Sequence, residues 1–179
     1  MEGLKDFEIP FVGLKKGSHL FEYQISKKFF EIFNFNEFND CDVLATINLV
    51  KKETFLELDI DIKGYVNIPC DVTTETFNQE IKGDLHLIVK FGHEFNDDND
   101  EVLIIPHEEY QINVSQYIYE LIILSTPSKR VHPKVLDGSM ESETLKKLEE
   151  LKIKENNSAK EKNSTDPRWD KLKDLLTDK

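Results

Sequence analysis

Two neighbouring segments with alternating apolar residues place the strongest constraint on the fold of this chain. In each segment every second residue is apolar, which is the period of a strand with one buried face. The apolar sets are Val43, Ala45, Ile47 and Leu49 in the first segment, and Leu56, Leu58, Ile60 and Ile62 in the second. Glu57, Asp59 and Asp61 alternate with the second set. We therefore predict an antiparallel hairpin with one buried face and one solvated, acidic face.

Further strands are predicted on both sides of this hairpin. They are Phe7 to Val12, His19 to Ile25, a continuation through Tyr65 to Cys70, Thr74 to Gly92, and Val102 to Ile105. A glycine within a strand often marks a bulge, so we expect bulges at Gly64 and Gly83. The polar run from Phe95 to Glu101 predicts a solvated loop, and Ser26 to Phe33 predicts a short helix.

A central helix is predicted from Val114 to Ser125. Asn113 is placed to cap the amide of the third helical residue, and Gln116 is placed to reach back toward the cap. The apolar surface of this segment is wide, which indicates burial on several sides. Pro127 is expected to end the helix, because proline lacks an amide donor and disfavours helical geometry in the residue before it.

The sequence pattern changes after this helix, and the chain is predicted to contain three regions. Residues 1–136 form an α+β domain whose antiparallel sheet is curved or barrel-like and carries one packed helix. Residues 137–165 form a charged linker, helical from Ser142 to Lys154 and disordered from Asn156 to Thr165. Residues 166–179 form a docking helix with Trp169, Leu172 and Leu176 on one face, which completes a helical C-terminal tail.

Charge is distributed unevenly along the 179 residues. Residues 1–127 hold 10 Lys or Arg against 24 Asp or Glu, whereas residues 128–179 hold 13 against 11. Because sequence-independent RNA affinity comes from cations that neutralise phosphates, an acidic body disfavours general adhesion to RNA. The N-terminus lacks a signal-peptide pattern and the longest apolar run is too short to span a bilayer, so we expect a cytoplasmic protein with free thiols at Cys41 and Cys70.

The residues do not combine into a recognisable catalytic or metal-binding motif. The chain has no G-x-S-x-G turn, no glycine-rich phosphate loop and no H-E-x-x-H helix, and its five histidines are scattered. Glu57, Asp59 and Asp61 could supply paired carboxylates, although a solvated sheet face explains them more simply. We therefore expect a protein that is not an enzyme and that needs no metal or cofactor.

Two segments stand out as candidate contact sites. The first contains Lys129, Arg130, His132 and Lys134, which place phosphate-binding side chains just after the central helix. The alternative is a loop whose cations neutralise helix carbonyls and nearby carboxylates. The second contains Arg168 and Trp169, residue types enriched where binding energy concentrates. Trp169 could equally anchor the tail to its own sheet.

Taken together, these motifs resemble the YceD family. The resemblance rests on the Gly64, Val66 and Cys70 spacing, the acidic loop, the helix from Asn113 to Leu124 with a proline after it, and the terminal Asp166-Pro167-Arg168. It covers most of residues 1–136 and the last dozen residues, while the stretch between them looks lineage-specific. Many members carry a Cys-x-x-Cys pair where this chain has Cys70 and Thr73, and further cysteines where it has Arg130 to Pro133. These departures argue against a metal-binding role.

The resemblance implies a function in ribosome biogenesis, since family members are implicated in the accumulation of large-subunit ribosomal RNA. We expect a non-enzymatic factor whose partners are that RNA, a large-subunit ribosomal protein, or both, without a membrane or small-molecule substrate. The alternative is an acidic binding module for a basic ribosomal protein or a cation, with no direct RNA contact.

Overall fold

The structure is a computed structural model that describes residues 2–99, 101–140 and 142–151. The chain divides into two compact units, Met1–Ser142 and Glu143–Lys179. The described part of the second unit is one helix, α4 (Glu143–Leu151), within the segment predicted to be helical. The predictions for residues 156–165 and 166–179, including Arg168 and Trp169, lie outside the described residues.

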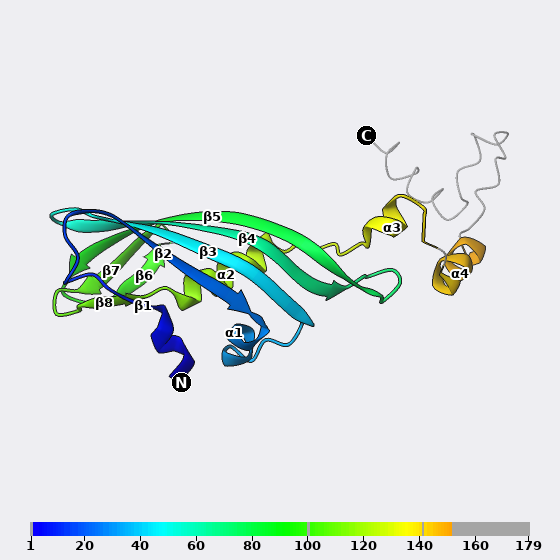
Figure 1. Cartoon of the computed structure of the whole chain (residues 1–179), viewed down its shortest axis with the longest axis horizontal. Coiled ribbons are helices and arrows are strands. Elements are labelled where there is room, and N and C mark those ends of the chain that lie inside the picture. The colour runs from blue at the N-terminus through cyan, green and yellow to red at the C-terminus, as the bar shows by residue number, and fades with distance from the viewer. Residues whose placement is uncertain (1, 100, 141, 152–179) are drawn as a thin grey trace, which may run out of the picture. The chain divides into compact units, whose positions relative to one another are not determined.

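The first unit is an α+β domain, as the sequence predicts (Figure 1). Its elements in chain order are the 3-10 helix η1 (Glu2–Phe7), β1 (Glu8–Pro10), β2 (Gly17–Ser26), α1 (Lys27–Ile32), β3 (Asp40–Lys51), β4 (Phe55–Pro69), β5 (Thr76–Gly92), β6 (Asn96–Asn99), β7 (Val102–Pro106), β8 (Gln111–Asn113), α2 (Ser115–Ser125) and α3 (Pro133–Leu136). Among the described residues, no helix has both the length and the apolar character needed to cross a membrane.

The predicted hairpin is present as β3 and β4, which run antiparallel with Ile47 opposite Ile60. The apolar members of both strands are buried, whereas Asp61 is exposed on the other face. On that solvated face, His86 Nδ1 lies 2.6 Å from Asp59 Oδ1, and Lys52 pairs with Glu57. The acidic alternation is therefore the solvated face of a sheet, as predicted.

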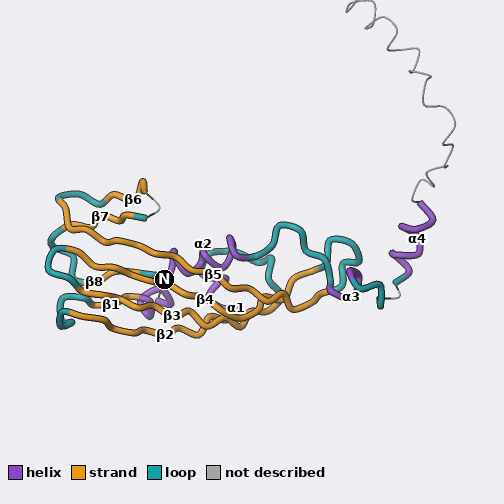
Figure 2. Tube along the Cα trace, turned by 90° about the horizontal axis from the view of Figure 1, so that it is seen from above, coloured by secondary structure: helices purple, strands orange, loops and turns teal. Residues whose placement is uncertain are grey.

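The predicted sheet, antiparallel and curved or barrel-like, is confirmed in part: every pair except one is antiparallel in the described residues, but the sheet is mixed and open rather than a closed barrel. Its six strands have the order β2-β3-β4-β5-β7-β6, so β2 and β6 are free edges and the sheet does not close (Figure 2). The pair β5 and β7 is parallel, because the chain reverses after Gly92, forms β6, and returns between β6 and β5. β6 lies within Phe95 to Glu101, where a loop was predicted. β1 and β8 form a separate two-stranded sheet, and only part of the strand predicted at Phe7 to Val12 is present.

Gly64 and Gly83 do not form bulges, because the pairing of β4 with β5 is continuous through both. Each glycine instead permits a close approach. A Cβ atom on Gly64 would lie 2.1 Å from the Asp42 carbonyl oxygen in the neighbouring strand. A Cβ atom on Gly83 would lie 2.2 Å from Ser125 Oγ and 3.1 Å from Leu121 Cδ1, so the absence of a side chain lets α2 pack directly on β5.

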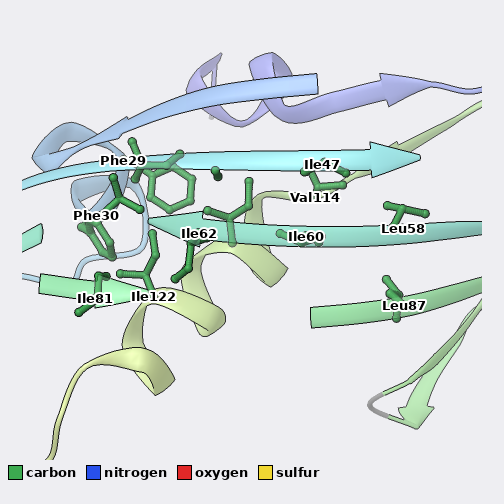
Figure 3. Close-up of a cluster of buried hydrophobic side chains, with 14 of the residues drawn as sticks. Phe29, Phe30, Ile47, Leu58, Ile60, Ile62, Ile81, Leu87, Val114 and Ile122 are labelled. Atoms are coloured by element: carbon green, nitrogen blue, oxygen red, sulfur yellow. The ribbon is translucent and has the colours of Figure 1, made fainter. Parts of the chain in front are cut away.

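Helix α2 covers one face of the sheet and completes the hydrophobic core. Ile118 and Ile122 are fully buried, and Figure 3 shows Ile122 facing the strands that carry Ile62 and Ile81. The predicted helix is thus confirmed, but burial on several sides is wrong at its C-terminal end. Leu124 is 82% exposed, because the sheet covers only the opposite side of the helix.

The N-terminus of α2 is capped differently from the prediction. The Asn113 side-chain oxygen accepts from the amide (3.0 Å) and the hydroxyl (2.6 Å) of Ser115, which is the first helical residue rather than the third. Gln116 does not reach back; its Nε2 donates to Glu120 Oε1 at 2.8 Å, one helical turn later. The difference arises because the position of Asn113 is also fixed by two other features. Its backbone is the last residue of β8, and its Nδ2 donates a hydrogen bond to the Leu4 carbonyl oxygen.

Candidate functional site

The turn between β4 and β5 forms the base of the candidate site. The Cys70 amide donates to the Glu75 carbonyl oxygen, and the Thr74 amide donates to the Cys70 carbonyl oxygen, both at 2.9 Å. Thr74 has a φ of 62°, a left-handed conformation that non-glycine residues adopt rarely and that here closes a short turn. We call residues 70–75 the hairpin turn.

Residues 128–134, which we call the basic loop, are hydrogen-bonded to this hairpin turn. The Asp71 amide donates to the Arg130 carbonyl oxygen at 2.8 Å, and the Arg130 amide donates to Asp71 Oδ2 at 2.7 Å. The His132 amide donates to the Cys70 sulfur at 3.3 Å. These three bonds join segments about 60 residues apart in the sequence, and they fix the path of the chain after α2.

The four cationic or titratable residues predicted in the basic loop have different environments. Arg130 is paired with Glu37, at 2.8 Å between Nη2 and Oε2. His132 packs its ring against Phe77, with centroids 5.2 Å apart, and its Nδ1 accepts from the Lys134 amide at the start of α3. Lys129 and Lys134 are exposed, and neither forms an ion pair with a described residue.

Among the described residues, the alternative reading of the basic loop, in which cations neutralise nearby carboxylates, applies to Arg130, which pairs with Glu37, and in part to Lys134, whose charge acts on Asp137. His132 Nδ1 accepts from the Lys134 amide, so this side chain caps α3. Arg130 and His132 hold the loop in place, which leaves the two lysines as its outward-facing cations.

Glu37 and Asp71 complete the site, and sequence reasoning missed both. Glu37 lies beside Phe38, which is 2% exposed and whose ring centroid is 4.9 Å from that of Phe30. The aromatic core thus positions Glu37 opposite Arg130. The only local signal for Asp71 is its place directly after Cys70, and no local pattern marks Glu37, because its partner is 93 residues away.

The Cys70 sulfur is the buried centre of this arrangement, with its residue 1% exposed. Burial raises the pKa of the thiol, but the Thr73 side chain and the amides of His132, Thr73 and Val72 lower it, and the net shift is downward. Thr73 Oγ1 is buried without a geometrically complete hydrogen bond within the described part of the chain, so the His132 amide is the firmest donor to the sulfur. By contrast, burial and the charges of Asp40 and Asp42 raise the pKa of Cys41 to about 12.

Both cysteines are free and buried. Within residues 2–99, 101–140 and 142–151, no group of three or more His, Cys, Asp or Glu side chains is arranged to hold a metal ion. Around Cys70, the side chain at position 73 is a threonine hydroxyl, and His132 Nδ1 is already bonded to the Lys134 amide. What this arrangement provides chemically is a firmly held loop that presents positive charge.

The fold and this site define an α+β protein in which an open, mixed sheet carries a cationic loop on an otherwise acidic domain. The chain belongs to the YceD family: the family model described as large ribosomal RNA subunit accumulation protein YceD matches residues 58–176. No curated protein and no solved structure matches the chain.

The family match confirms the resemblance predicted from the sequence, but its extent differs. It begins at Leu58, so it leaves out the first 57 residues, and it includes the stretch after residue 136 that looked lineage-specific. Within the described residues, the matched span contains the hairpin turn, the basic loop and α2.

Proposed function

We propose that this protein is a non-enzymatic, cytoplasmic factor that supports the accumulation or assembly of large-subunit ribosomal RNA. The observation that carries the proposal is the family match, whose description names large ribosomal RNA subunit accumulation. Contact with RNA occurs through the basic loop, where Lys129 and Lys134 face outward while Arg130 and His132 hold the backbone.

The charge distribution supports a local contact rather than general adhesion. Residues 1–127 carry an excess of 14 acidic side chains, which repel phosphates over most of the domain. Lysine binds phosphate as a point charge on a flexible stem, so two exposed lysines on a fixed backbone suit a weak, reversible RNA contact. Arg168 and Trp169 could extend this contact as predicted from the sequence.

Depletion of the protein from cells tests the proposal. We expect the ratio of large-subunit to small-subunit ribosomal RNA to fall, together with the large-subunit peak in a sucrose gradient. Re-expression of the unaltered protein should restore both. Normal RNA ratios and normal gradients in fully depleted cells would rule out the proposed function.

Reversal of the two lysine charges tests direct RNA contact. The double variant Lys129→Glu/Lys134→Glu should bind large-subunit RNA more weakly and flatten the slope of log affinity against log salt by about 1.5, because each phosphate contact contributes about 0.7 to 0.9. The matched control is Lys63→Glu/Lys82→Glu, which changes the same charge at two exposed, paired positions of β4 and β5. Equal effects of the two double variants would show that only net charge matters.

A second candidate function, an acidic binding module for a basic protein, is favoured by the charge of the body. If depletion lowers large-subunit RNA while the charge-reversed protein still binds and complements, the contact with the assembling subunit is made through a protein. The structure contains a surface suited to that role.

A further inference from the structure

A groove with a volume of about 650 Å³ lies between α2 and the end of the sheet formed by β5, β6 and β7. Its floor is apolar and includes Leu103 and Ile105 of β7, which are 3% and 5% exposed, together with Leu121 of α2. Figure 1 shows how β6 and β7 extend the sheet beyond the part covered by the helix. The groove therefore arises because the six-stranded sheet is wider than the single helix packed on it.

Large apolar side chains at the mouth of this groove are exposed to solvent. Phe95 is 60% exposed and Leu124 is 82% exposed, and both line the groove. Exposed apolar side chains beside a concave apolar floor are typical of a binding surface, because burial against a partner would remove them from water.

The rim of the groove is acidic. Asp97, Glu109 and Glu120 line it, and no Lys, Arg or His side chain of the described residues does. In the sequence, residues 91–128 contain eight Asp or Glu and no Lys or Arg. A concave surface lined by charges of one sign concentrates the field and attracts groups of the opposite sign.

The environment of Tyr117 shows that the negative charges of these carboxylates combine within the groove. Tyr117 lines the groove and is half-buried, and its pKa is raised to about 12 by burial and by the negative charges of Asp97 and Glu120. These two carboxylates come from β6 and α2, so the fold brings their charges to one place.

Alkaline titration should reveal this environment. Folding favours the neutral phenol of Tyr117, so its stabilising contribution is complete below the ordinary tyrosine pKa of about 10. It should be lost as the pH rises from there to about 12, the pKa in the folded protein. Phenolate absorbance during titration should show a late step that Tyr117→Phe removes. Neutralising the two carboxylates with Asp97→Asn/Glu120→Gln should move this step to lower pH. A titration curve unchanged by Tyr117→Phe would contradict the assignment.

We propose that this groove binds a basic peptide segment of a partner protein, with Lys or Arg side chains on the acidic rim and an aliphatic or aromatic side chain on the apolar floor. Charge complementarity selects this occupant. An RNA segment would bring phosphates toward three carboxylates. A purely apolar ligand would leave those carboxylates without counter-charges.

The peptide site is separate from the basic loop. The hairpin turn that holds the basic loop follows β4 and precedes β5, whereas β6 and β7 follow the opposite end of β5. A strand of 17 residues spans roughly 50 Å, so β6 and β7 lie far from the hairpin turn. The groove also runs along α2 to Leu124, five residues before Lys129, but it shares no lining residue with the basic loop. The proposal therefore names a partner surface beyond the RNA contact, and the two can fail independently.

Binding to overlapping peptides that span the large-subunit ribosomal proteins tests the peptide site. We expect the full chain to select peptides that combine Lys or Arg with a large apolar residue. The rim variant Asp97→Asn/Glu109→Gln/Glu120→Gln should weaken the selected peptides by about tenfold, since charges at a rim each contribute modestly. Leu124→Ser should also weaken them. Because Leu124 is 82% exposed, this substitution should leave folding intact, which thermal unfolding checks.

The matched control neutralises three acids on the other face of the sheet, with Glu57→Gln/Asp59→Asn/Asp61→Asn. This variant has the same net charge as the rim variant and should retain peptide binding. Equal losses of peptide affinity in the rim variant and the control variant would show that only bulk charge matters and would overturn the proposal. Full peptide binding by Leu124→Ser or by the rim variant would also overturn it. Lys129→Glu/Lys134→Glu should leave peptide binding intact, so failure of the RNA contact and failure of the peptide site are distinguishable.

Discussion

Phe30→Ala should lower the free energy of unfolding by about 3 to 5 kcal/mol, the usual cost of removing a phenyl ring from a packed core. Phe30 is 1% exposed, and its ring lies against those of Phe35, Phe38 and Tyr119 at centroid distances of 5.8, 4.9 and 6.0 Å. The segment after α1 and helix α2 thus share one aromatic cluster. Urea unfolding followed by circular dichroism measures the change.

Two control variants separate cavity formation from a general effect of substitution. Phe30→Leu keeps most of the volume and should cost clearly less than Phe30→Ala. Leu20→Ala removes an apolar side chain that is 63% exposed and should change stability by less than about 0.5 kcal/mol. A loss below about 1 kcal/mol for Phe30→Ala would show that the aromatic cluster is not tightly packed.

This aromatic cluster also supports the candidate site. Glu37 lies in the segment between Phe35 and Phe38, and it pairs with Arg130 of the basic loop. Loosening of the cluster should therefore release Glu37 and weaken the attachment of that loop. We expect the RNA affinity of Phe30→Ala to fall at temperatures where the domain is still largely folded.

Gly64→Ala should destabilise the protein by about 3 kcal/mol or more, beyond the usual cost of adding a methyl group to a packed interior. The new Cβ atom would lie 2.1 Å from the Asp42 carbonyl oxygen and 2.6 Å from the Val43 Cα atom. Both neighbours are backbone atoms of β3, so relief requires that two long paired strands separate. The loss should appear as a lower midpoint in urea unfolding.

Gly13→Ala provides the matched control for this substitution. A Cβ atom on Gly13 would meet no atom within 4 Å, so stability should stay within about 0.5 kcal/mol of the unaltered protein or rise slightly. Similar destabilisation by both substitutions would show that the effect comes from the loss of glycine in general. A tolerated Gly64→Ala would mean that β3 and β4 are farther apart at this point.

The two surfaces suggest how an acidic protein could act during large-subunit assembly. The basic loop presents Lys129 and Lys134 near one end of β5, and the acidic groove presents Asp97 and Glu109 near the other end and Glu120 on α2. Our two proposals assign RNA to the first surface and a basic protein segment to the second. A factor of this kind could hold an RNA segment near a ribosomal protein without binding either tightly.

Local sequence patterns determined the long strands and the central helix of this protein, but not β6 or β8. The alternation in residues 43–50 and 56–62 matches β3 and β4, because a strand with one buried face repeats every two residues. The helix preceding Pro127 matches α2, because capping and proline geometry act within a few residues. The family was also recognisable from motifs in the sequence, and the match confirms it.

Only the tertiary structure determined how those elements pair and pack against one another. The parallel pairing of β5 with β7, the close approaches at Gly64 and Gly83, and the Arg130–Glu37 pair join positions that no local period relates. The groove depends on the width of the sheet relative to one helix, which is a property of strand order. A sequence of alternating residues specifies which face of each strand is buried. The order of the strands, and hence the site, is set by packing between segments that are distant along the chain.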